Sequence, residues 1–149
     1  MSARVQDILI SAEDVGKEFR FPQGIVDRLS GKPPLSVHAL NGVSFEIRRG
    51  ETLGIVGESG CGKSTLARCL VRLHEADKGR ILFEGKDIAA LAGPARRVFN
   101  RRVQMIFQDP YSSLNPRMKV RQILGEALMV HKMRPAAEVP ARIAELLAL

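Results

Sequence analysis

Eight consecutive residues combine glycines, a lysine and a serine at a spacing that could bind phosphate groups. They are Gly57-Glu58-Ser59-Gly60-Cys61-Gly62-Lys63-Ser64, which fit the pattern GxxxxGK[ST]. Glycines adopt backbone angles that other residues avoid, and they let backbone N–H groups approach a phosphate without side-chain interference. Successive N–H groups and the N-terminus of a following helix make such a loop attractive to anions. The segment is therefore predicted to bind the phosphates of a nucleotide.

The side chains at the end of this loop have separable chemical roles. Lys63 supplies a flexible positive charge for the β- and γ-phosphates of a nucleotide. The hydroxyl of Ser64 suits Mg²⁺, and Thr65 adds a phosphate contact. Cys61 lies inside the loop near a helix N-terminus, where thiols are more reactive, so its alkylation is expected to block nucleotide binding.

The elements predicted on either side of the loop are those that such a site requires. Residues 52–56 form a short apolar run, which is typical of a fully buried strand. After the loop, apolar residues recur at helical spacing and predict a core-facing helix: Leu66, Cys69, Leu70 and Leu73. The alternative is a glycine-rich surface turn that happens to contain a lysine, and this strand–loop–helix context argues against it.

The remaining pattern predicts short strands, a long loop and further helices. Strands are predicted at 8–15, 43–48, 80–83 and 103–107, of which 43–48 alternates as an antiparallel strand does and 103–107 is a second buried run. The Pro- and Gly-rich stretch 22–36 predicts a loop. Helices are predicted near Ile88, at 94–102, at 120–128 and around 143–147.

Length, composition and charge limit the classes of protein to which the chain can belong. With 149 residues, 45% of them hydrophobic, the chain can form a globular core, which excludes collagen-like, disulfide-stapled and wholly disordered proteins. The formal net charge of +7 favours an anionic partner. No uncharged apolar run approaches the ~18 residues of a membrane-spanning helix, and no secretory signal is expected at the N-terminus. Two cysteines fit a reducing, intracellular compartment.

Two segments together carry a resemblance to a known family. They are Gly57–Thr65 and the run Phe107-Gln108-Asp109-Pro110-Tyr111-Ser112-Ser113-Leu114-Asn115-Pro116-Arg117-Met118. With them the chain resembles the ATP-binding subunits of ABC transporters, and within that family the ATPases of oligopeptide, dipeptide or nickel importers. The stretches 50–56 and 79–88 and the loop 22–36 support this resemblance. A GTPase is excluded because Asn-Lys-x-Asp and Asp-x-x-Gly are absent, whereas the phosphate loop alone leaves a small-molecule kinase open.

The resemblance implies a fold and a set of binding residues. The implied fold is an α/β P-loop NTPase core with an antiparallel β flank and the start of a helical subdomain, all in one truncated ATP-binding domain. Residues 1–108 would form the ATP-binding core, and 109–149 the Q-loop and the start of the helical subdomain. In the family, the glutamine matching Gln108 reaches Mg²⁺ and the attacking water, and the aromatic matching Phe19 stacks on adenine, although Phe21 is an alternative. The resemblance therefore implies ATP and Mg²⁺ as cofactors, with Ser64 and Gln108 as the metal ligands.

The resemblance also implies a transport function with several partners. Two ATP-binding subunits, identical or different, sandwich two ATP·Mg²⁺ and drive transmembrane permease subunits that import peptides. A solute-binding protein outside the membrane takes part indirectly. The subunit would lie peripherally on the cytoplasmic face of the cell membrane.

Three motifs of this family do not occur in the chain. They are the Leu-Ser-Gly-Gly-Gln signature, a Walker B strand ending in Asp-Glu, and the switch histidine. No catalytic residue is therefore assigned, and the chain alone is expected to be poorly soluble and inactive as an ATPase. The apolar last residue, Leu149, indicates a domain that is cut within a helix. Two alternatives stay open: a short protein that binds nucleotide without hydrolysis, and a soluble ABC-type ATPase.

A basic cluster precedes Gln108 and consists of Arg96, Arg97, Arg101 and Arg102. No aromatic residues are interleaved as in nucleic-acid readers, so a nucleic-acid partner is not expected. A solvated helix face is the simplest interpretation. Docking against membrane subunits or anionic lipid is the alternative.

Overall fold

The computed structural model describes residues 7–22, 35–109 and 114–148. These residues belong to two compact units, 1–103 and 104–149. The predicted loop 22–36 falls almost entirely outside the described residues. The division into a core, 1–108, and a helical part, 109–149, concerns function and stays a prediction.

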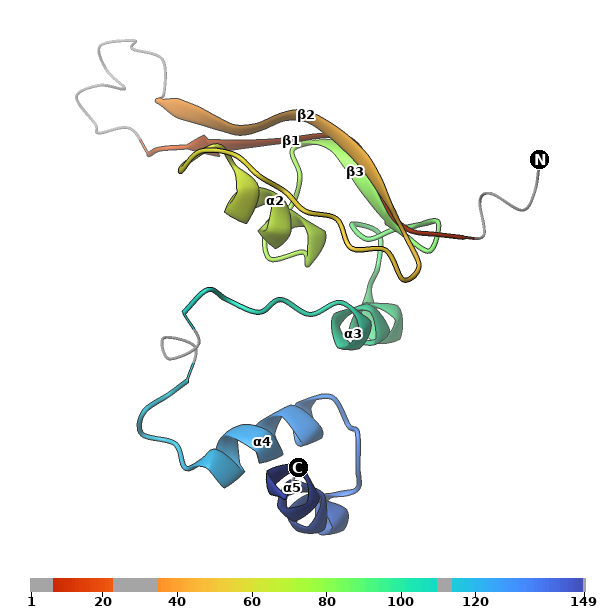
Figure 1. Ribbon diagram of the computed structural model, residues 1–149, viewed down its shortest axis with the longest axis vertical. Coiled ribbons are helices and arrows are strands. Elements are labelled where there is room, and N and C mark those ends of the chain that lie inside the picture. Colours follow the sequence, from red (N-terminus) through yellow and green to blue (C-terminus); the bar gives the residue numbers. More distant parts are fainter. Residues whose placement is uncertain (1–6, 23–34, 110–113, 149) are drawn as a thin grey trace. The chain divides into compact units, whose positions relative to one another are not determined.

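An antiparallel four-stranded sheet organises the first unit (Figure 1). β1 (Ile8–Arg20) pairs with β2 (Ser36–Arg48) on one side and with β3 (Lys78–Phe83) on the other. β4 (Lys86–Asp87) completes the order β2-β1-β3-β4. The strands predicted at 8–15, 43–48 and 80–83 are confirmed, the second of them as antiparallel. β1 and β2 are longer than predicted, and each extends toward the segment 23–34.

One helix packs on this sheet directly after the phosphate loop. α2 (Lys63–Leu70) buries Leu66 and Cys69, as its apolar spacing predicts. Leu73 was expected on the same stripe, but it lies beyond the helix and is exposed. The cause is Arg72, whose left-handed φ of 58° ends the helix while the N–H of Leu73 donates to Arg68 O at 2.8 Å. The buried core contains Ala12, Val15, Leu40, Leu66, Cys69, Ile81, Phe83, Ile88 and Phe99.

α3 (Gly93–Arg102) begins with Pro94 in its first turn, which agrees with the predicted helix. It is anchored by Phe99, whose ring meets Phe83 edge-on at 5.4 Å between centroids. The helix predicted near Ile88 is not formed: residues 88–90 make a bend and a turn, and 91–92 are irregular. Their carbonyls are held instead by Arg72, which donates to Ala89 O at 2.8 Å and to Leu91 O at 2.6 Å.

The second unit is a pair of helices joined by a short turn. α4 (Val120–Val130) and α5 (Val139–Leu147) confirm the two predicted helices, and the 3₁₀ turn η2 (Ala136–Glu138) leads into α5. Gly125 of α4 is buried, and a Cβ at that position would lie 3.4 Å from Ile143 Cδ1. The helices therefore approach closely at a residue without a side chain. None of the described helices is long and apolar enough to cross a bilayer.

The prediction of two buried strands, at 52–56 and 103–107, is wrong. Residues 52–56 and 103–107 are not in a sheet, and Val56 and Ile106 are 95% and 93% exposed. A parallel strand forms only where neighbouring strands accept and donate its backbone hydrogen bonds. Within the described parts of the chain, all strand pairs are antiparallel and none includes these two segments.

Candidate nucleotide phosphate site

The loop between residue 56 and α2 owes its shape to glycine. Gly60 and Gly62 have left-handed φ angles of 83° and 99°, which L side chains rarely adopt. A Cβ on Gly62 would also lie 2.3 Å from Ala39 O of β2. Glycine at position 62 therefore allows the loop to turn into α2 while lying directly against the sheet.

The N-terminus of α2 is open to an anion. Its N-cap is Gly62, which has no side chain to accept a hydrogen bond from the first turn. The first intrahelical bond runs from Leu66 N to Gly62 O at 2.8 Å, so the helix itself uses none of the N–H groups of residues 63–65. With the positive end of the helix dipole at the same place, these groups suit a phosphate.

The ammonium group of Lys63 is held inside the loop. Lys63 Nζ donates to Gly57 O at 2.7 Å and to Glu58 O at 2.6 Å. Its third neighbour is Cys61 Sγ at 3.5 Å, a weak acceptor. Carbonyl contacts keep the positive charge next to the open helix N-terminus, and a phosphate oxygen could replace the sulfur at small cost.

The other predicted loop residues surround this centre. Glu58, Ser59 and Cys61 are exposed, and so is Ser64 in the first turn of α2. Thr65 is half-buried. These residues lie in the loop and the first turn of α2, and Ser64 is exposed there. Their roles in binding nucleotide and metal stay predictions.

Phe19, the predicted adenine-stacking residue, lies on β1 opposite Val37. Its ring packs edge-on against His74 with centroids 5.4 Å apart, and Lys17 Nζ lies 5.6 Å from its centroid. The alternative, Phe21, is 54% exposed just after the strand. These contacts describe the surroundings of Phe19, and its stacking role stays a prediction.

Sequence reasoning missed the polar contacts that fix the end of β1. Asp77 accepts from Glu18 N at 2.8 Å and from Lys17 Nζ at 3.0 Å. These donors, the backbone N–H first, hold the pKa of Asp77 below its ordinary value. The partners are about 60 positions apart in sequence, so no local pattern could indicate them.

Gln108 belongs to the second unit, whereas the phosphate loop belongs to the first. Its side chain is exposed, and the residues that follow it, 110–113, lie outside the described ranges. The expected role of Gln108 in binding Mg²⁺ therefore stays a prediction.

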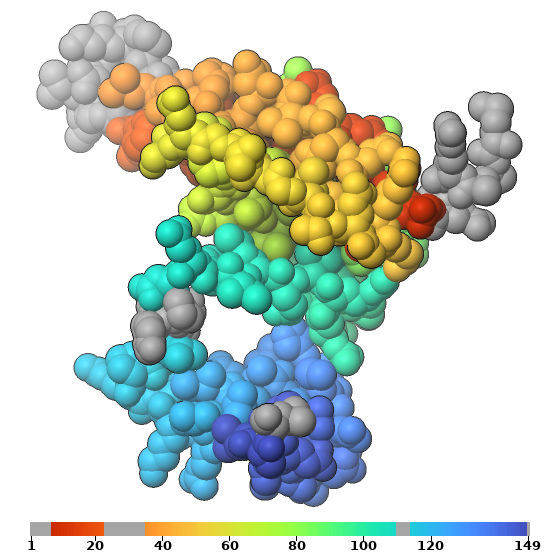
Figure 2. All heavy atoms as spheres, viewed as in Figure 1, coloured from red at the N-terminus to blue at the C-terminus, as the bar shows by residue number. Residues whose placement is uncertain are grey.

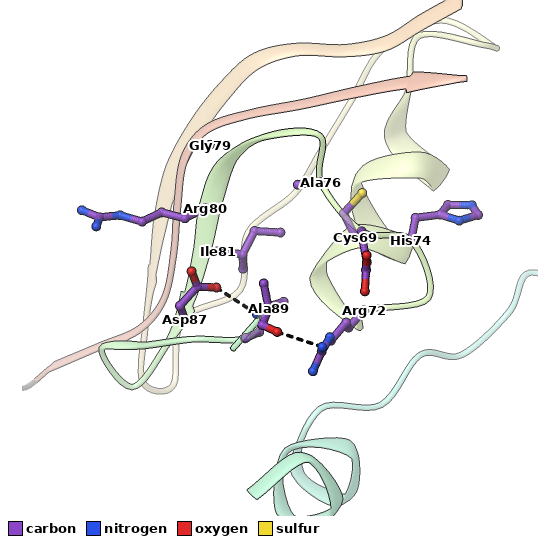
Figure 3. A pocket seen from close by; sticks show the side chains of 11 residues that line it. Cys69, Arg72, His74, Ala76, Gly79, Arg80, Ile81, Asp87 and Ala89 are labelled. Atoms are coloured by element: carbon purple, nitrogen blue, oxygen red, sulfur yellow. Dashed lines mark hydrogen bonds between the residues drawn. The ribbon is translucent and has the colours of Figure 1, made fainter. Parts of the chain in front are cut away.

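A cavity of about 180 Å³ lies beside the C-terminal end of α2 and is distinct from the phosphate loop (Figure 3). Cys69, Arg72 and Ile81 line it, together with Asp87 and Ala89. Asp87 Oδ1 accepts from Ala89 N at 2.8 Å, and Arg72 donates to Ala89 O. These polar groups bind the turn after β4, so the cavity reflects local structure.

Residues 40–148 match the sequence profile of a family described as ABC transporter. The chain belongs to the ABC transporter family. This confirms the resemblance carried by Gly57–Thr65 and Phe107–Met118.

Among relatives within the ABC transporter family, two from Bacillus subtilis (strain 168) are oligopeptide transport ATP-binding proteins. AppF is 44% identical over 149 residues, which covers 99% of this chain and 44% of AppF. OppF is 50% identical over 117 residues, which covers 77% of this chain and 38% of OppF. The chain thus spans less than half the length of these relatives.

A solved structure of this family supports the predicted fold class. It is cbiO1 from Clostridium perfringens, described as part of the ABC transporter complex cbiONQ. The likeness has a TM-score of 0.59 at 27% identity and covers 95% of this chain and 50% of that chain. Together with the antiparallel sheet and α2, it confirms an ABC ATPase fold with an antiparallel β flank.

Proposed function

We propose that this chain binds ATP·Mg²⁺ through Gly57–Thr65. The observation that carries the proposal is the position of Lys63 Nζ, 2.7 Å from Gly57 O and 2.6 Å from Glu58 O, beside the uncapped N-terminus of α2. A preorganised cation and free backbone donors at one place are the requirements of a triphosphate site.

The residues present fit both the nucleotide and the metal ion. A side chain on Gly62 would collide with Ala39 O, so the compact loop exists only with glycine there. Lys63 would contact the phosphates, and Ser64 would offer its hydroxyl to Mg²⁺. Bound Mg²⁺ would supply neutralisation of the phosphate charge. Gln108 as a second metal ligand and Phe19 as the adenine-stacking residue are parts of the same proposal.

The transport role follows from the relatives. AppF and OppF are named oligopeptide transport ATP-binding proteins, and we propose the same role for this protein. Its partners would be permease subunits, a second ATP-binding subunit and, indirectly, a solute-binding protein. It would act on the cytoplasmic face of the membrane, where ATP hydrolysis powers peptide import.

The binding proposal is tested by calorimetric titration of the chain with MgATP. Replacing Lys63 by Ala removes a charge-assisted hydrogen bond to phosphate, which predicts a roughly 10- to 100-fold weaker affinity. The matched control is Arg68→Ala, because Arg68 is an exposed cation of the same helix, α2. Equal affinity of the Lys63→Ala and Arg68→Ala variants would contradict the proposal.

A further inference from the structure

The two faces of α3 have different environments. Phe99 is buried on the inner face, and Ala95, Val98 and Arg102 line a cavity of about 290 Å³ beside Phe83. Arg102 donates to both carboxylate oxygens of Glu84, at 2.5 and 2.6 Å, and lies 4.8 Å above the ring of Phe83. The inner face is therefore fixed against β3 and the turn after it.

The opposite face carries three arginines that we name the arginine stripe: Arg96, Arg97 and Arg101. All three are exposed. Arg97 and Arg101 are four positions apart and share the outer side of the helix. Arg96, one position before Arg97, lies at the edge of that side, about 100° around the helix axis. Within the described ranges, no carboxylate forms an ion pair with any of them, in contrast to Arg102.

Arg96 and Arg97 do not help the helix that carries them, whereas Arg101, in the last turn, lies near the negative end of the helix dipole. α3 has no acidic residue in its first turn, and its N-cap, Ala92, offers no side-chain cap. Arg96 and Arg97 thus stand in the half of the helix that carries the positive end of the dipole. Arg97 and Arg101 also repel one another across one turn. An external anionic surface would offset both the unfavourable interaction with the helix dipole and the repulsion between Arg97 and Arg101.

We propose that the arginine stripe docks on the anionic lipid headgroups of the membrane surface. Guanidinium groups bind phosphate with two parallel hydrogen bonds, and several on one helix face suit a plane of phosphates. The choice of a membrane over another polyanion rests on the proposed function, which places the chain at a membrane. α3 also exposes no aromatic ring for stacking on nucleic-acid bases, since its one aromatic, Phe99, is buried.

The experiment is flotation of the full chain with vesicles of phosphatidylglycerol and phosphatidylcholine, in ~0.1 M salt and without nucleotide. The triple variant Arg96→Gln/Arg97→Gln/Arg101→Gln is expected to partition roughly a hundredfold less onto the anionic vesicles. Binding of the original chain should fall on raising the salt to ~1 M, where the screening length is about 3 Å, and should be absent on pure phosphatidylcholine. Free inorganic phosphate at ~10 mM should not compete, because a surface concentrates many headgroups at once.

Two further triple variants control for charge and folding. Arg48→Gln/Arg68→Gln/Arg121→Gln removes the same charge from scattered exposed positions and should keep vesicle binding within about threefold. Arg96→Lys/Arg97→Lys/Arg101→Lys keeps the charge of the stripe and should also bind. Loss of binding in either control, or full binding by the glutamine triple, would overturn the proposal. So would capture of the original chain by heparin or an oligonucleotide without any vesicle binding.

Nucleotide affinity separates this inference from the proposed function. The glutamine triple should bind MgATP as the original chain does, because the stripe contributes no residue to Gly57–Thr65. If the original chain floats with anionic vesicles but binds no MgATP, the nucleotide proposal fails and the docking surface stands. If it binds MgATP but does not float, the docking surface alone fails.

Discussion

Glycine at position 62 decides whether the phosphate loop can exist in this form. Its φ of 99° is unfavourable for an L residue, and a Cβ would lie 2.3 Å from Ala39 O, an atom of the β2 backbone that cannot move aside easily. Gly54 has neither constraint, because its φ is not left-handed and a Cβ there meets nothing within 4 Å. The two glycines therefore form a matched pair.

Replacing Gly62 by Ala should destabilise the chain by about 2 kcal/mol or more, because left-handed strain is combined with a backbone collision. Urea unfolding followed by circular dichroism measures this change, and MgATP titration should show weaker binding at the same time. Gly54→Ala should change stability by less than about 0.5 kcal/mol. Unfolding of the two variants at the same urea concentration would contradict the close approach of the loop to β2.

The thiol of Cys61 provides a second test at the phosphate loop. It is exposed and lies 3.5 Å from Lys63 Nζ, whereas the Cys69 thiol is buried, and burial raises its pKa. A maleimide should therefore label Cys61 first and weaken MgATP binding at least tenfold by filling the loop. Prior addition of MgATP should protect Cys61, as peptide mass analysis would show. Unchanged affinity after complete labelling of Cys61 would rule out this arrangement.

Sequence could predict the phosphate loop because its chemistry is local: glycines, lysine and serine within eight positions. It could not predict the hydrogen bonds from the Arg72 guanidinium to the carbonyls of Ala89 and Leu91, because these residues are 17 and 19 positions from Arg72. The same holds for Asp77, which fixes the end of β1 near Phe19 from a distant part of the chain. Local motifs thus identify the reactive groups but not the residues that position them.

At the scale of elements, Glu84 connects three parts of the first unit. It lies in the turn between β3 and β4, and it pairs with Arg102 at the end of α3 and with Arg49 after β2. Hydrogen bonds from Arg102 and then from Arg49 lower the pKa of Glu84 from 4.5 to about 2. The ionised carboxylate therefore holds α3 to the sheet.

This linkage predicts a defined acid dependence. Because the folded-state pKa of Glu84 lies below its unfolded value, its stabilisation is complete above pH 4.5 and is lost as the pH falls to about 2. The Glu84→Gln variant should melt below the original chain at pH 6, and the gap in Tm should close between pH 4.5 and about 2. Glu46→Gln, at an exposed position of β2, is the control and should show no such gap. A pH-independent gap for Glu84→Gln would mean that its charge has no part in holding α3.

The two apolar runs at 52–56 and 103–107 mark the limit of element prediction. Their composition is that of buried parallel strands, yet both are outside the sheet and largely exposed. An apolar sequence favours burial, whereas a strand also needs hydrogen-bond partners for its backbone N–H and C=O groups. The antiparallel strands and the amphipathic helices were predictable because β1, β2 and β3 pair with one another and each helix makes its own backbone hydrogen bonds.

For the molecule as a whole, exposed apolar surface and positive charge have opposite effects. Leu53, Ile55 and Val56 are 40%, 43% and 95% exposed, and the segment 51–58, yellow in Figure 2, lies at the surface. Such surface promotes association, while a net charge of +7 opposes it. Salt screens the repulsion between chains, so association should increase as salt is added.

ATP hydrolysis requires more than the phosphate loop supplies. A base must orient the attacking water next to the γ-phosphate, and within Gly57–Thr65 the sole acidic residue is Glu58. Its backbone carbonyl accepts from Lys63 Nζ at 2.6 Å, and its side chain is exposed. The chain by itself should therefore bind MgATP without releasing phosphate above background. Phosphate release at saturating MgATP measures this, and the Lys63→Ala variant sets the baseline. Steady turnover that Lys63→Ala abolishes would show that a water-activating group lies among these 149 residues, and Glu58→Gln would then be the first variant to test.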